Sequence, residues 1–80
     1  MAPYSAADAR GLLKTAVRDN NPVVFLENEM MYGDSFDLTA EEVSHDFLIP
    51  IGKAKIERVG KHITIVAFAK MVKFSLLAAE

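Results

Sequence analysis

The run from Pro22 to Gly33 constrains the fold of this chain more than any other feature. Four consecutive apolar residues, Val23 to Leu26, come directly after a proline, and an acidic, amide-rich turn that ends at Gly33 follows them. Short runs that are apolar throughout are typical of strands buried on both faces, as in parallel sheets. Polar residues at the carboxyl end of such a strand lie where open α/β sheets place ligands and interfaces.

A helix is predicted before this strand. Ser5 and Asp8 have the spacing of a capping box, with Asp in place of the usual Glu. Apolar residues then recur on one helical face, namely Ala9, Leu12, Leu13, Ala16 and Val17. Residues 19–22 end the helix, because the residue before a proline disfavours the helical region. A helix, a short loop and a buried strand make up half of a βαβ unit.

Residues 33–50 are predicted to form a linker. Thr39 and Glu42 have a second capping-box spacing, enough for one helical turn. Several apolar residues fall within the linker: Phe36, Leu38, Val43, Phe47 and Leu48. We therefore expect it to lie against a surface of the protein.

A second strand–helix signature follows Pro50. Residues 53–58 alternate between apolar and polar side chains, which indicates a half-exposed strand, and residues 63–68 indicate a buried one. Residues 59–62 are predicted to form the turn between them. Val72, Leu76 and Ala79 recur at helical spacing, so a helix is expected over residues 71–80. Because each unit looks incomplete, the chain is predicted to be a segment that spans the end of one α/β domain and the start of another.

Composition limits the classes of function. The 80 residues suffice for one small domain, and 51% of them are hydrophobic, so we expect the chain to pack on a partner or to be a piece of something larger. A net charge of −2, from 9 basic and 11 acidic side chains, favours neither nucleic acid nor an anionic membrane as a partner. There is no cysteine for a disulfide or a thiolate metal site. No apolar run approaches the roughly 20 residues of a membrane span.

Two sets of residues could carry chemistry. Glu27 and Glu29 could form an acid–base pair at the strand end, although bonding of this turn to its own backbone or a subunit contact is the commoner role. Asp19 and Asn21 follow a helix end whose carbonyl oxygens lack partners. These oxygens could hold a hard cation, although a solvated loop is the commoner outcome on chemistry alone. His45 and His62 have no second ligand at a suitable spacing, and no role is assigned to them.

Three stretches resemble one family. They are residues 3–18, residues 21–29 (NPVVFLENE) and residues 49–58 (IPIGKAKIER). In order and approximate spacing they are similar to the beta subunit of the pyruvate dehydrogenase decarboxylating component, a thiamine-dependent 2-oxo acid dehydrogenase. One pair departs from the pattern, since Ala69-Lys70 stands where relatives usually have Ser-Arg or Ser-Lys.

The resemblance implies an α/β fold and a position within a longer subunit. Residues 1–32 would end a pyrimidine-binding, transketolase-like domain, residues 33–50 would be the linker, and residues 51–80 would start a transketolase C-terminal-like domain. The implied enzyme is an oxidoreductase that decarboxylates pyruvate with thiamine diphosphate and passes the acetyl group to a lipoyl carrier, on the route to acetyl-CoA. The glutamate that activates the cofactor has no counterpart here, so the chain alone is expected to be inactive.

The resemblance also implies cofactors and partners. Thiamine diphosphate and magnesium would be bound mainly outside this segment, and no catalytic or cofactor-binding residue is assigned within it. A potassium ion is implied at the end of the first helix, at Ala16, Val17, Asp19 and Asn21. The implied partners are an alpha subunit and a second beta subunit in a heterotetramer, and dihydrolipoamide acetyltransferase through the parent complex, in the mitochondrial matrix or alternatively the plastid. The competing hypothesis is a non-catalytic interaction module of 80 residues, or a truncated product, that folds only on a partner.

Overall fold

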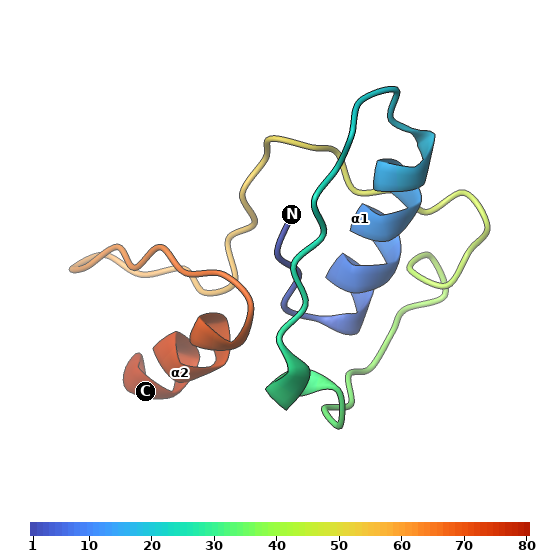
Figure 1. The fold of residues 1–80 in the computed structure, drawn as a ribbon. Coiled ribbons are helices and arrows are strands. Elements are labelled where there is room, and N and C mark those ends of the chain that lie inside the picture. The colour runs from blue at the N-terminus through green and yellow to red at the C-terminus, as the bar shows by residue number, and fades with distance from the viewer.

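The computed structural model describes residues 1–80 and contains three short helices joined by extended chain (Figure 1). They are the α-helix α1 (Ala6–Arg18), the 3₁₀ helix η1 (Glu29–Met31) and the α-helix α2 (Lys70–Ala78). Neither α-helix has the length and apolar character that crossing a membrane requires.

Helix α1 begins where its capping box predicts. The Asp8 N–H donates to the Ser5 hydroxyl oxygen at 3.1 Å, and the Ser5 N–H donates to the Asp8 carboxylate at 3.1 Å. These reciprocal bonds satisfy two N–H groups that have no partner within the helix. At the other end, Asp19 has an extended backbone, and its N–H donates to the Ala16 carbonyl at 3.2 Å. The predicted first helix is therefore confirmed.

The structure contains no strand, which corrects the prediction of strands at residues 23–26, 53–58 and 63–68. The first of these segments is extended and runs beside α1 (Figure 1). Its only backbone pairing is with Met1, whose nitrogen donates to the Val24 carbonyl at 2.7 Å and whose carbonyl accepts from the Leu26 N–H at 2.8 Å. No backbone bond joins residues 53–58 to residues 63–68. A strand needs a ladder of neighbours, so the α/β fold is not confirmed by this chain alone.

Very little of the chain is buried. Only Ala7 and Gly11 are buried, and the other residues are partly or largely exposed. The accessible surface is 6453 Å² and the radius of gyration 13.4 Å. A compact domain of this size would have roughly 4800 Å² and about 11.6 Å. The excess of roughly 1700 Å² is about twice the surface that one partner buries in a standard protein–protein interface, about 800 Å².

Helix α2 begins one residue before its predicted start and has an unusual entry. Ala69 at its N-cap has φ 49° and ψ −134°, and no side chain caps the helix. A residue with a Cβ is strained at such a positive φ. Val72 and Leu76, predicted to share a face, are less exposed than Met71 and Leu77. The predicted second helix is thus confirmed, with Lys70–Ala78 as its bounds.

Candidate functional site

The loop that follows α1 is where the resemblance implies a cation. Asp19 Oδ1 accepts from the Asn21 backbone N–H at 2.8 Å and from Asn21 Nδ2 at 3.0 Å, which closes a small turn. The Ala16 carbonyl accepts from the Asp19 N–H, whereas no backbone bond outside the helices reaches the Val17 carbonyl. Asp19 is half-buried, and Asn21 is exposed.

The chemistry of this loop suits a hard cation. Its donors are a single carboxylate, an amide oxygen and main-chain carbonyls at the negative end of a helix. Across the chain, no three His, Cys, Asp or Glu side chains come together in a group that could hold a metal ion. Asp19 is the one carboxylate among the predicted cation ligands, and the others are neutral oxygens.

Polar side chains of the acidic turn at residues 27–32 form hydrogen bonds within that turn. The Tyr32 hydroxyl donates to Glu27 Oε2 at 2.8 Å, and Asn28 Oδ1 accepts from the Met30 N–H at 3.0 Å, which caps η1. The bond to the Glu27 carboxylate, together with its negative charge, raises the pKa of Tyr32. These contacts favour a structural role for the acidic turn over acid–base chemistry by Glu27 and Glu29.

A hollow of about 230 Å³ lies between this turn and the start of α1. Tyr4 and Phe36, two of its lining residues, meet edge to face with ring centroids 5.3 Å apart. Glu27 and Tyr32 also line it, but their polar groups are bonded to each other. The hollow therefore offers mainly apolar contact.

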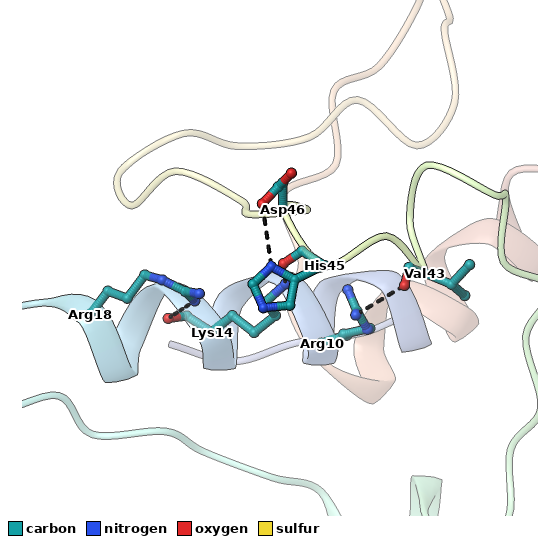
Figure 2. A network of polar contacts seen from close by, with 6 residues as sticks. All are labelled: Arg10, Lys14, Arg18, Val43, His45 and Asp46. Atoms are coloured by element: carbon teal, nitrogen blue, oxygen red, sulfur yellow. Dashed lines mark hydrogen bonds and ion pairs between the residues drawn. The ribbon is translucent and has the colours of Figure 1, made fainter.

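A further set of polar contacts lies along α1, at residues for which the sequence predicts no role. We name residues 42–49 the strap, because this part of the linker runs across one face of α1 (Figure 2). Arg10 donates to two consecutive strap carbonyls, Glu42 at 3.0 Å and Val43 at 3.1 Å, and Lys14 Nζ donates to the His45 carbonyl. The second part of the predicted linker, residues 42–49, thus lies against α1.

The far end of the strap also contacts α1, beside Gly11. Thr15 Oγ1 lies 2.7 Å from the Ile49 carbonyl oxygen and 2.9 Å from the Gly11 carbonyl oxygen, and the Ile49 N–H donates to the Gly11 carbonyl at 3.4 Å. A Cβ built on Gly11 would lie 2.6 Å from Ile49 Cγ1 and 2.8 Å from Phe47 Cε2. Only glycine allows this approach. The signals in the sequence were the helical glycine and the cations Arg10, Lys14 and Arg18 at intervals of four.

Comparison with known proteins identifies several that are similar to this chain in sequence. No family model matches it, and no solved structure matches it. Over all 80 residues it is 65% identical to a protein of Arabidopsis thaliana, "Pyruvate dehydrogenase E1 component subunit beta-1, mitochondrial", and 62% identical to the corresponding beta subunit of Caenorhabditis elegans. It is 62% identical over 79 residues to the beta subunit of Mus musculus.

The chain is thus homologous to enzyme subunits along its whole length. Those subunits are beta subunits of the pyruvate dehydrogenase E1 component, so the resemblance found in the sequence is confirmed. The chain spans 22% of the Arabidopsis thaliana and Mus musculus proteins and 23% of the Caenorhabditis elegans protein, and so corresponds to a segment of each.

Proposed function

We propose that this chain works as a segment of a mitochondrial pyruvate dehydrogenase E1 beta subunit. The observation that supports this most directly is the 65% identity over all 80 residues with a protein of that name. In the assembled enzyme, pyruvate is decarboxylated with thiamine diphosphate and magnesium, and the acetyl group passes to a lipoyl carrier. No observation favours the alternative of a separate, non-catalytic module.

Within that subunit we assign the segment to a domain junction. Residues 1–32 end a pyrimidine-binding domain, residues 33–50 form the linker, and residues 51–80 begin a transketolase C-terminal-like domain. The extended runs at residues 23–26, 53–58 and 63–68 then become strands, because the rest of the subunit supplies their neighbours. The large exposed surface of the chain supports this assignment.

The cofactors and partners follow from the same proposal. Thiamine diphosphate and magnesium are bound by the full assembly, mainly outside this segment, and an alpha subunit and a second beta subunit complete a heterotetramer. Dihydrolipoamide acetyltransferase meets this assembly within the parent complex. The oxygens of Ala16, Val17, Asp19 and Asn21 hold potassium, which neutralises the negative end of α1 and fixes the loop that leads to the extended run at residues 23–26.

A segment exchange tests the proposal. The 80 matching residues of the Arabidopsis thaliana beta-1 subunit would be replaced by this chain, and the chimera would be produced together with its alpha subunit. We expect pyruvate-dependent decarboxylation in the presence of thiamine diphosphate and magnesium. A subunit that lacks the segment is the matched negative control. A chimera that assembles with the alpha subunit but shows no more turnover than this control would contradict the proposal.

A further inference from the structure

Helix α1 carries a row of positive side chains that needs an explanation. Arg10, Lys14 and Arg18 are spaced by four and therefore form one stripe on the helix surface (Figure 2). Like charges at this spacing repel each other. Partial desolvation, reinforced by the charges of Arg10 and Arg18, lowers the pKa of Lys14. A stripe of this kind is favourable only when it faces acceptors.

The acceptors in this structure are main-chain oxygens. Arg10 and Lys14 bond to the carbonyls of Glu42, Val43 and His45, and the Thr15 hydroxyl contacts the carbonyl of Ile49. The strap side chains point elsewhere at two of these positions. The Val43 side chain is half exposed, and the His45 side chain is 92% exposed, with its Nδ1 lying 3.3 Å from Asp46 Oδ1.

We propose that one face of α1, formed by Arg10, Gly11, Lys14 and Thr15, is a backbone-reading clamp for the strap. Arg10 spans two consecutive carbonyls with its planar fork, which an ammonium group cannot do. Gly11 lets Phe47 and Ile49 approach the helix axis. Thr15 holds the carbonyl after which the chain departs toward residues 51–80. The clamp thereby fixes where the linker leaves α1, and with it the starting point of the following domain.

A backbone-reading clamp has an asymmetric signature. Changes to the side chains of α1 remove donors. Changes to the outward-facing strap side chains, Val43 and His45, leave every acceptor in place and do not touch the packing at Gly11. Helix-side substitutions should therefore release the strap, and strap-side substitutions at the same contacts should not. A linker held by its side chains would show the reverse. This inference goes beyond the proposed function, because an active chimera can have a loose strap and an inactive one a tight strap.

The test measures hydrogen exchange of the strap in the chimeric subunit assembled with its alpha subunit. Lys14→Ala is paired with His45→Ala, and Arg10→Ala with Val43→Ala, so that each pair addresses one contact from both sides. We expect peptides covering residues 42–49 to exchange about tenfold faster in the helix-side variants, as loss of a hydrogen bond to a charged group implies. The strap-side variants should exchange like the parent.

Two further variants keep the test decisive. Thr15→Val preserves the shape of the side chain and removes only the hydroxyl, and Arg10→Lys preserves the charge and removes the fork. Both should speed exchange, Arg10→Lys by less than Arg10→Ala. Equal effects from the two sides of a pair would overturn the proposal, as would an unchanged strap in the helix-side variants. Faster exchange that extends through α1 itself would mean helix unfolding and would also overturn it.

Discussion

Residues 1–49 and residues 51–80 differ in how many of their polar groups form hydrogen bonds and in how far their apolar side chains are buried. The first region closes two capping boxes, at Ser5–Asp8 and Thr39–Glu42, and lays its strap on α1. In the second, every residue from 51 to 66 is exposed, including Val66 at 92%. One ion pair between side chains links the regions, Lys73 Nζ to Asp34 Oδ1 at 3.8 Å. Hydrogen bonds between side chain and backbone can form within a short segment, whereas a strand forms only when a neighbouring strand is present to pair with it.

The largest expected effect is the loss of folding and activity when the segment stands alone. We expect the 80-residue chain to lack a cooperative thermal transition as a monomer, because the apolar side chains of its second region have nothing to pack against. We also expect no pyruvate decarboxylation with thiamine diphosphate and magnesium above a control that contains only the cofactors. Calorimetry at low micromolar concentration, with the mass measured in parallel, checks the first expectation. A sharp monomeric transition would show that residues 51–80 need no partner.

The sequence was sufficient wherever the determining contacts are local. The Ser5–Asp8 spacing located the start of α1, and the apolar spacing of Val72 and Leu76 located α2. The prediction of strands failed because strand formation depends on nonlocal contacts. An extended run such as residues 63–68 has no neighbouring strand to pair with within these 80 residues. The strap contacts were missed because their acceptors are carbonyls, which every residue has and no sequence pattern reveals. Whether the Asp19 loop binds potassium stays a prediction.

A second prediction compares one glycine from each region. Gly11→Val should destabilise the subunit by about 1–3 kcal/mol, because overpacking against Phe47 and Ile49 forces the strap to shift. Gly60→Val is the matched substitution, since nothing lies within 4 Å of its added Cβ. Denaturant unfolding of the assembled chimera measures both. Equal costs would remove the contrast between a packed first region and an open second one.

A third prediction concerns the end of α1. In the assembled chimera, potassium should raise the melting temperature relative to a large organic cation at equal ionic strength, and Asp19→Ala should remove most of this rise. The stabilisation amounts to about 1.4 kcal/mol when free potassium is ten times its dissociation constant. Asp37→Ala, an exposed carboxylate in the linker, is the control. If the parent shows no potassium dependence, or Asp19→Ala keeps all of it, the loop is simply solvated.

A fourth prediction addresses the strained entry to α2. Ala69→Gly should stabilise the assembled chimera by about 1 kcal/mol, because glycine accepts a φ of 49° without steric cost. Ala78→Gly, at the last residue of the same helix, should have the opposite sign and cost up to about 1 kcal/mol. Melting temperatures of the two variants provide the comparison. If both are destabilising, the assembled subunit relaxes Ala69 out of this conformation, and the second region changes on assembly.

The smallest effect lies in the first region, at the contact between Tyr32 and Glu27. The Tyr32 pKa is raised because its neutral hydroxyl donates to the Glu27 carboxylate and a phenolate would face that negative charge. A raised folded-state pKa means that this contact contributes fully below the ordinary value of 10.0, and that its contribution is lost as the pH rises through the raised value. Stability from this contact should therefore fall only at strongly alkaline pH.

Ultraviolet titration of the phenolate in the 80-residue chain measures this shift, in a Tyr4→Phe background where Tyr32 is the one remaining tyrosine. Glu27→Gln should lower the Tyr32 pKa by removing the charge, and Glu27→Ala should lower it further by removing the acceptor as well. Glu29→Gln, two residues along, leaves the bonded pair intact and should change nothing. Since the contact spans five residues, it should survive even where the second region has no partner. If the Tyr32 pKa is the same in both Glu27 variants as in the parent, the first region, too, depends on assembly for its local hydrogen bonds.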